Sequence, residues 1–273
     1  MLTFKAKLKY YYLNSTIKYT QNLYYKCPLT RSFILSSKRI IHTAKIVSCH
    51  KHTELIREFN FEMQQPSEFI FRAGQFLMIH IPASEGEKTP LRAYSIASGD
   101  QFKNSFRLLI KYVPNGIASE YFWKLSTGDD VKFTGPFGKL FFPQVPAQKL
   151  FFLSTGSGLA PHLSYIEAHL TQFPDSNFEF LIGVRTKQDF FFTEYLEQKK
   201  LQFPNFNFQF VLSRPDEHWN GRSGYLQTQI ETLDINPEKS QFFICGNEEM
   251  AKSTKQALIS AKLSPENIFV EIF

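Results

Sequence analysis

Two short stretches of the chain combine residue types that can hold a nucleotide. The first runs from Arg92 to Ser98 and places a guanidinium, a tyrosine ring and a small hydroxyl within four residues. A guanidinium is a planar fork of donors suited to a phosphate. In a strand, Arg92 and Tyr94 would share one face while Ser95 points the other way. A phosphate clamp beside an aromatic ring is what a flavin nucleotide needs.

The second stretch, Ser154 to Pro161, reads Ser-Thr-Gly-Ser-Gly-Leu-Ala-Pro and lies between an apolar run and a helical pattern. Backbone N–H groups at the start of a helix bind anions, and glycine lets a phosphate approach closely. The order strand, glycine turn, helix predicts a cradle for a dinucleotide pyrophosphate. The same turn could instead serve only to pack the helix on the strand.

The composition indicates a globular protein. Of 273 residues, 43% are hydrophobic and 21% charged, enough to bury a core in one large domain or two ordinary ones. No run of 18 apolar residues occurs, so we expect no membrane span.

The net charge of +6 comes from one end of the chain. The first 53 residues hold ten Lys and Arg and no acid, which leaves 21 basic and 25 acidic residues for the other 220. The body is therefore mildly acidic, with a net charge of −4. This argues against nucleic-acid binding, which favours a basic face.

The three cysteines, Cys27, Cys49 and Cys245, are scattered along the chain. They predict neither a disulfide framework nor a metal site. An iron–sulfur domain needs four clustered cysteines, so any iron partner in electron transfer would be another polypeptide.

Residues 1–40 form a tail rich in Lys, Tyr and Ser, without a regular period. The tail is either disordered, mis-assigned as translated sequence, or an organelle transit peptide, with Arg31–Ser36 resembling a mitochondrial processing site. We expect a cytoplasmic protein, or one of the mitochondrial matrix if the tail is a transit peptide.

The remaining chain divides into two patterns, which predict a two-domain α+β fold. Residues 41–145 predict a six-stranded antiparallel β-barrel with one helix, Ile117–Leu125; its strands are Thr43–Cys49, Glu54–Met63, Gln75–Ile81, Leu91–Ala97, Ser105–Val113 and Asp129–Thr134. Residues 146–273 predict an α/β domain with a five-stranded parallel sheet, because strands and helices alternate. Its strands are Leu150–Ser154, Phe178–Val184, Phe206–Leu212, Gln241–Cys245 and Ile268–Ile272, and its helices are His162–Leu170, Phe192–Leu201, Leu226–Leu233 and Met250–Leu263. Two prolines near 143–148 mark the boundary.

Six motifs occur in one order and spacing: Arg92–Ser95, Gly116–Ser119, Gly135–Gly138, Thr155–Pro161, Cys245–Asn247 and Val270–Phe273. On these motifs residues 42–273 resemble the ferredoxin–NADP reductase superfamily, flavin reductases in which an antiparallel barrel precedes a nicotinamide domain. The resemblance covers the whole chain except the tail.

The resemblance implies a flavin site on the barrel. Arg92 would pair with the flavin phosphate, Tyr94 would pack on the isoalloxazine, and the Ser95 hydroxyl would reach flavin N5. The other flavin-binding residues would be Ala93, Ile110, Lys111 and, at the start of a helix, Gly116, Ile117, Ala118 and Ser119. Tyr94 could instead be a surface tyrosine, and Ser119 a plain helix cap.

The resemblance also implies a nicotinamide nucleotide site. Thr155, Gly156 and Gly158 would hold the pyrophosphate; Ser213, Arg214, Arg222 and Tyr225 would hold the adenosine end and its 2′-phosphate. No acid stands at that strand end to bind a ribose hydroxyl, which favours NADPH over NADH. Arg214 could equally be a surface arginine. Cys245 and Gly246 would lie against the nicotinamide, although Cys245 could also be a buried structural residue.

Three residues are the expected catalytic set: Ser95, Cys245 and Glu271. By the resemblance, Glu271 orients Ser95 or relays a proton, and Phe273 covers the isoalloxazine.

The function implied is transfer of a hydride from NADPH, or NADH, to FAD, or FMN, and of electrons to a separate carrier such as ferredoxin or flavodoxin. Two enzymatic alternatives are a free-flavin reductase and the reductase component of an oxygenase. A nucleotide-binding redox sensor is the non-enzymatic alternative. We expect a monomer.

Overall fold

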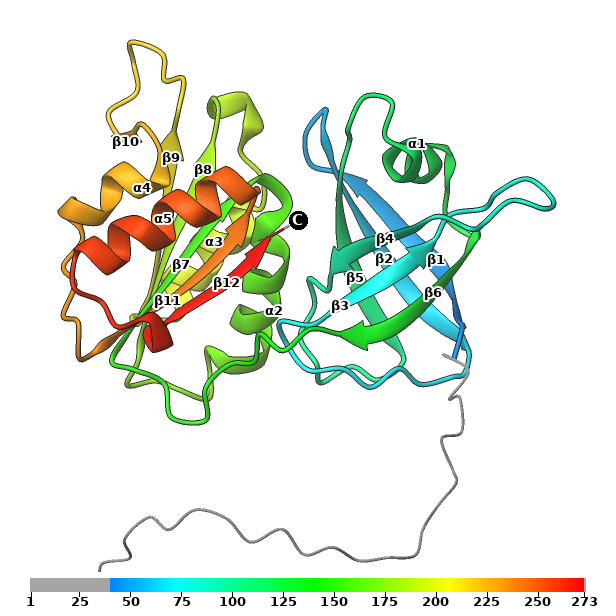
Figure 1. Cartoon of the computed structure of the whole chain (residues 1–273), viewed down its shortest axis with the longest axis horizontal. Helices are drawn as coiled ribbons and strands as arrows, with labels where there is room; N and C mark the ends of the chain where they lie inside the picture. Colours follow the sequence, from blue (N-terminus) through cyan, green and yellow to red (C-terminus); the bar gives the residue numbers. More distant parts are fainter. Residues whose placement is uncertain (1–39, 273) are drawn as a thin grey trace, which may run out of the picture. The chain divides into compact units, whose positions relative to one another are not determined.

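The computed structural model describes residues 40–272. The expected tail therefore lies almost wholly outside the described residues, as does the expected aromatic cover at Phe273. Two six-stranded sheets make up the described part (Figure 1).

The first sheet is antiparallel, with strand order β4-β3-β6-β1-β2-β5. Its strands are β1 (His42–Lys51), β2 (Ile56–Gln65), β3 (Phe76–His80), β4 (Leu91–Ser95), β5 (Ser105–Lys111) and β6 (Asp130–Phe137), and α1 (Ile117–Lys124) follows β5. Buried and exposed residues alternate along these strands, so the sheet encloses one apolar core on its inner face. Phe59, Phe61 and Phe133 are fully buried there, and Phe122 of α1 joins them.

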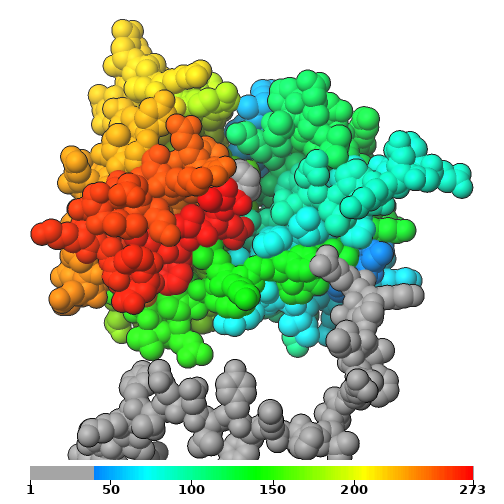
Figure 2. Space-filling view, viewed as in Figure 1, coloured from blue at the N-terminus to red at the C-terminus, as the bar shows by residue number. Residues whose placement is uncertain are grey.

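The two end strands of this sheet, β4 and β5, meet at a single bridge. Ile96 pairs with Leu108, and Ala97 N–H donates to Arg107 O at 2.8 Å. The next positions, Tyr94 on β4 and Ile110 on β5, share no bridge, so within the described residues β4 is laddered only to β3. The barrel is thus joined at one point and open beside it; we call this opening the seam. An exposed loop, residues 82–89, leads into β4 and projects from the surface (Figure 2).

The second sheet is parallel, with strand order β10-β9-β8-β7-β11-β12. Its strands are β7 (Lys149–Thr155), β8 (Asn177–Val184), β9 (Phe206–Leu212), β10 (Arg222–Ser223), β11 (Ser240–Gly246) and β12 (Ile268–Ile272). The five expected strands are confirmed. The sixth, β10, has only two residues, which pair with Val211 and Leu212, and so short a polar pairing leaves no pattern in the sequence.

Helices cover both faces of the parallel sheet (Figure 1). Residues of α2 (Leu159–His169) and α3 (Thr193–Gln202) pack on one face, and residues of α4 (Leu226–Gln229) and α5 (Glu248–Ser260) on the other. Because both faces are buried, apolar residues predominate in the five longer strands and do not simply alternate with polar ones. The two-domain fold class is therefore confirmed. The boundary near residue 145 stays a prediction.

Several helix limits differ from the expected ones by one to four residues, and α5 ends at Ser260 rather than Leu263. Helix α2 begins three residues early because Pro161 fits the first turn, where its missing N–H is not needed. Helix α5 begins at Glu248 because the Asn247 side chain accepts from Met250 N and caps it. Helix α4 ends after four residues and continues as a 3₁₀ turn, Ile230–Thr232.

No helix in residues 40–272 is long and apolar enough to cross a membrane.

Candidate functional site

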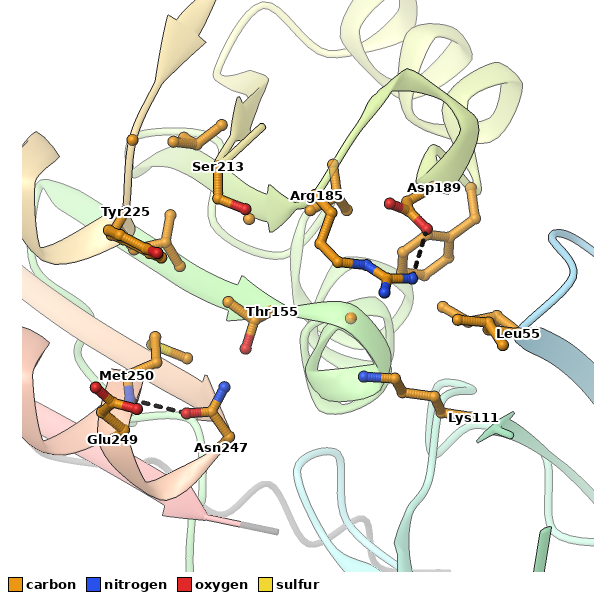
Figure 3. A pocket seen from close by; sticks show the side chains of 18 of the residues that line it. Leu55, Lys111, Thr155, Arg185, Asp189, Ser213, Tyr225, Asn247, Glu249 and Met250 are labelled. Carbon is orange, nitrogen blue, oxygen red and sulfur yellow. Dashed lines mark hydrogen bonds and ion pairs between the residues drawn. The ribbon is translucent and has the colours of Figure 1, made fainter. Parts of the chain in front are cut away.

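A pocket of about 530 Å³ opens at the carboxyl ends of the parallel strands (Figure 3). This edge is where the strand order changes direction, since β8 lies on one side of β7 and β11 on the other. Ligands of open parallel sheets bind at such a point. Five of the expected site residues line the pocket: Lys111, Thr155, Gly156, Ser213 and Tyr225.

The turn after β7 forms the floor of the pocket. Gly156 has φ of +54°, in the left-handed region that glycine adopts without strain, and a short 3₁₀ turn to Gly158 leads into α2. A Cβ placed on Gly156 would lie 3.8 Å from Lys111 Nζ, so this lysine of β5 reaches the cradle. Lys111, which was expected to contact the flavin, therefore lines this pocket at the carboxyl ends of the parallel strands.

Gly246, at the end of β11, is required by close packing rather than by its backbone angles. A Cβ there would overlap Thr155 Oγ1 and Met250 Cε. Asn247 follows and turns its side chain back onto Met250 N, at 2.9 Å (Figure 3). The start of α5 thus packs against the turn after β7 with no room for a side chain between them.

Ser95 and Glu271 are joined across the molecule. Ser95 Oγ donates to Glu271 Oε1 at 2.6 Å, although 176 residues separate the two in sequence. Burial raises the pKa of Glu271, and the hydrogen bond from Ser95 opposes this. The hydroxyl of Ser95 is therefore held in one direction by a half-buried carboxylate.

Cys245 lies in register between Glu271 of β12 and Ser154 of β7. Its thiol is fully buried, and burial, with a further contribution from Glu271, raises the pKa of Cys245 well above its ordinary value. The thiol is consequently protonated and uncharged at neutral pH. The structure thus brings together the three residues expected to be catalytic.

The Arg92–Ser95 strand borders the seam. Tyr94 is half-buried and meets the ring of Phe122 edge-to-face at 5.5 Å; burial raises the pKa of Tyr94 to about 12, with Arg92 acting in the opposite direction. Arg92 and Ala93 are exposed, and the Arg92 guanidinium donates only to its neighbour's carbonyl, Leu91 O, at 2.9 Å among the contacts of residues 40–272. The guanidinium can therefore reorient toward an anion.

The start of α1 offers backbone N–H groups. Gly116 is the N-cap residue and has no side-chain capping bond, so Ile117, Ala118 and Ser119 begin the helix without intrahelical acceptors. The Ser119 hydroxyl is directed to Val113 O at 2.8 Å and accepts from Val113 N at 3.1 Å. The hydroxyl stabilises the preceding turn and is not a helix cap.

The expected adenosine residues do not all gather at the pocket. Tyr225 is 63% exposed at its rim, and Arg214 is exposed beside Ser213. Arg222 points elsewhere: its guanidinium donates to Gln209, to Gln229 at 3.2 Å and to Thr232 at 2.6 Å. Arg222 lines a second, separate hollow.

Sequence reasoning missed Arg185 and Asp189, which face the pocket together (Figure 3). Arg185 Nη2 contacts Asp189 Oδ1 at 3.3 Å, and Asp189 Oδ2 accepts from Thr186 N at 3.0 Å. The signal was present as a capping box, Thr-x-x-Asp, directly after an arginine at a strand end. Within the described residues no group of three or more His, Cys, Asp or Glu is placed to hold a metal ion.

The two halves match two known domain families. The oxidoreductase FAD-binding domain model matches residues 43–142, and the oxidoreductase NAD-binding domain model matches residues 152–256. Ferredoxin--NADP reductase B of Sorangium cellulosum is 31% identical over 221 residues, which cover 78% of this chain and 89% of that protein. This chain belongs to the ferredoxin–NADP reductase superfamily.

Two further similar proteins show the range of the superfamily. One component of the Na(+)-translocating NADH-quinone reductase of Serratia proteamaculans is 26% identical over 272 residues, covering 84% of this chain and 67% of that polypeptide. A ferredoxin NADP+ reductase from Neisseria gonorrhoeae, solved with bound FAD and NADP, superposes with a TM-score of 0.75 at 25% identity, covering 85% of this chain and 98% of that one. Membership makes the chain a flavin-dependent NAD(P)H oxidoreductase.

Proposed function

We propose that this protein takes a hydride from NADPH and delivers the electrons to a separate carrier protein, a ferredoxin or a flavodoxin. The observation that carries the proposal is the 2.6 Å hydrogen bond between Ser95 and Glu271, beside the buried Cys245. It joins the barrel strand next to the seam to the last strand of the parallel sheet. The 31% identical relative named as a ferredoxin–NADP reductase supports the choice of carrier.

The residues around the seam fit an FAD molecule. Tyr94 and Ile110 border the unpaired strand edges, where backbone groups are free to bond a ligand. The Arg92 guanidinium and the N–H groups at the start of α1 supply donors for its phosphates. When bound, FAD would accept two electrons as a hydride and release them singly. The role of the chain itself would be to bind the two nucleotides, to orient their reacting rings and to shield these rings from solvent.

The nucleotide pocket fits NADPH in an extended form. Thr155 and Gly156 line it at the turn before α2, and Lys111 adds a positive charge at the position proposed for the pyrophosphate. Tyr225 would stack on the adenine at the rim. The nicotinamide would lie at the ends of β7 and β11, next to the buried and uncharged thiol of Cys245. Holding the two reacting rings in contact is the main contribution that this chain can make to the rate.

Arg214 and Arg185, rather than Arg222, are the residues we expect to bind the 2′-phosphate. Changing either to alanine should raise the KM for NADPH roughly 10-fold or more, the scale of one hydrogen bond to a charged group, while the KM for NADH changes little. Steady-state kinetics with both nucleotides would measure this. A selective loss of NADPH affinity in Arg222→Ala, with Arg214→Ala and Arg185→Ala unchanged, would overturn the assignment and favour Arg222.

An anaerobic titration of the purified protein with NADPH, then NADH, tests the function directly. The expected result is a stoichiometric loss of flavin absorbance near 450 nm. This loss should occur at lower concentrations of NADPH than of NADH. Colourless protein that oxidises NADPH only with added flavin would indicate a free-flavin reductase. Bound flavin that neither nucleotide reduces would indicate a sensor. Transfer from the reduced protein to ferredoxin or flavodoxin, followed separately, tests the carrier.

A further inference from the structure

A largely buried ion pair ties β5, beside the segment that follows Ser95, to the helix that begins at the nucleotide cradle. Arg107 Nη2 of β5 contacts Glu167 Oε1 of α2, and their side chains are only 15% and 17% exposed. Neither residue lines the pocket or contacts the Ser95–Glu271 pair in any hydrogen bond. Their place between the two sites suggests a task other than contact with a ligand.

Both residues of the ion pair also form hydrogen bonds with residues 97–99, which follow Ser95 in the chain. Arg107 Nη2 also donates to Ala97 O at 2.8 Å, and Arg107 N donates to Ser98 Oγ at 3.1 Å. On the other side, Glu167 Oε2 accepts from Gly99 N at 2.8 Å. A largely buried carboxylate that accepts one hydrogen bond from a backbone N–H and one from a guanidinium holds a fixed position.

Helix α2 adds a second hold on the same segment. Ser164, one turn before Glu167, donates from Oγ to Ser98 O at 2.6 Å, and both residues are buried. Ala97, Leu109 of β5 and Leu163 of α2 belong to one apolar cluster, which joins this part of the barrel to α2. We call Arg107, Ser164, Glu167 and the backbone of 97–99 the latch.

The latch connects the cradle turn before α2 to the segment that follows Ser95. Helix α2 starts at Leu159, directly after the turn Gly156–Gly158, so its first turn moves with the cradle. Ala97 lies two residues after Ser95. The distance between the cradle and Ser95 is therefore fixed through the latch and through the hydrogen bond of Ser95 to Glu271.

We propose that Arg107 and Glu167 are positioning residues for hydride transfer: their ion pair holds the nucleotide cradle in register with Ser95. This inference rests on the proposed function. A misplacement of about 1 Å between reacting groups costs on the order of 100-fold in rate, so a small slip at the latch has a large kinetic effect. Binding of the nucleotide itself uses other residues and is expected to persist.

Glu167→Gln is the direct test, because the amide still offers an acceptor to Gly99 N while the charge is lost. We expect the limiting rate of flavin reduction at saturating NADPH, followed anaerobically by stopped flow, to fall roughly 10- to 100-fold. The Kd for NADPH, from the concentration dependence of that rate, and the flavin content should change less than about twofold. The long-wavelength charge-transfer absorbance between nicotinamide and flavin, which requires the rings in contact, should weaken.

Two further variants keep the test decisive. In a double-mutant cycle, Arg107→Gln with Glu167→Gln should be no slower than the slower single variant, because the pair acts as one unit. If Glu167→Gln does not fold, Ser164→Ala, which removes one uncharged contact, should slow reduction in the same direction. Asp130→Asn is the control: Asp130 pairs with Lys45 at 2.8 Å on the exposed barrel surface and should leave the rate unchanged.

The outcomes separate the latch from the function. A wild-type flavin that NADPH does not reduce would overturn the proposed function. A wild-type protein that is reduced, with Glu167→Gln and Ser164→Ala at the same limiting rate and only a lower Tm, would overturn the latch alone.

Discussion

Ser95→Ala is expected to slow the limiting rate of flavin reduction by NADPH roughly 100-fold, the usual effect of removing one preorganised donor from a reacting centre. The protein should fold normally, because the variant removes one hydroxyl at a half-buried site. It also leaves the Glu271 carboxylate without the hydrogen bond that it now accepts at 2.6 Å. Anaerobic stopped-flow measurement of the flavin absorbance gives the rate.

The pH dependence supplies a second signature of the same pair. Since burial raises the pKa of Glu271, this side chain takes up a proton at higher pH than an exposed glutamate does. The reduction rate should therefore fall as pH decreases through that raised pKa, because only the carboxylate holds Ser95 strongly. Glu271→Gln should be slow and should lose this acidic limb.

The raised pKa of Glu271 also affects stability. Over the same pH range in which the reduction rate should rise with pH, the stability of the fold should fall. Between the ordinary pKa of Glu271 and its raised value, the folded state binds more protons than the unfolded state. The contribution of Glu271 to stability is thus lost as pH rises through this window.

Ser48→Ala controls for the loss of a hydroxyl. Ser48 Oγ accepts from Asn60 Nδ2 at 3.1 Å on the exposed side of the β1–β2 pair, so its removal should leave reduction unchanged. If Ser95→Ala matched Ser48→Ala in rate at every pH, the proposed role of the Ser95–Glu271 pair would be wrong.

Gly246→Ala is expected to weaken nucleotide binding, with a KM for NADPH raised roughly 10-fold. The new methyl group would overlap Thr155 Oγ1 and Met250 Cε, and forcing a methyl into a packed site costs about 1–3 kcal/mol. Met250 has a flexible side chain and can bend away, whereas Thr155 directly precedes the cradle turn, so its displacement is expected to disturb that turn. Isothermal titration with NADP⁺ would measure the loss of affinity apart from any change in rate.

Gly86→Ala is the comparison for Gly246→Ala. Gly86 lies in the exposed loop before β4, and a Cβ there meets nothing within 4 Å, although its φ of +86° disfavours alanine. It should lower stability slightly and leave NADP⁺ affinity unchanged. Equal affinities in the two variants would show that the close packing at Gly246 does not hold the cradle.

Local pattern was enough to predict the fold, because alternation in one half and apolar runs in the other follow directly from which sheet faces are buried. The direction in which individual side chains point was harder to predict than the fold. Arg222 lies on a two-residue strand whose pairing with Val211 no pattern reveals, and its guanidinium turns to Gln209 and Thr232. Lys111 is the last residue of β5, a barrel strand, yet it reaches Gly156, since β5 runs toward the turn after β7.

Contacts between side chains that are far apart in the sequence were the other feature that the sequence did not predict. The resemblance to a known family linked Ser95 with Glu271, but nothing in the chain between them specifies their contact. Arg107 and Glu167 carry no motif at all, and a charged residue in a strand or helix usually indicates a solvated face. Their partial burial follows from the packing of α2 against the segment after Ser95, which only the three-dimensional structure shows.

The seam leaves a strand edge at which two molecules could associate. A strand edge with free backbone donors and acceptors can pair with the same edge of another molecule, and β4 presents such an edge from Arg92 to Ser95. A ligand seated there caps the edge and, by mass action, favours the folded monomer. A flavin at this position would therefore act as a substitute strand, protecting the newly made chain from self-association before it takes part in any reaction.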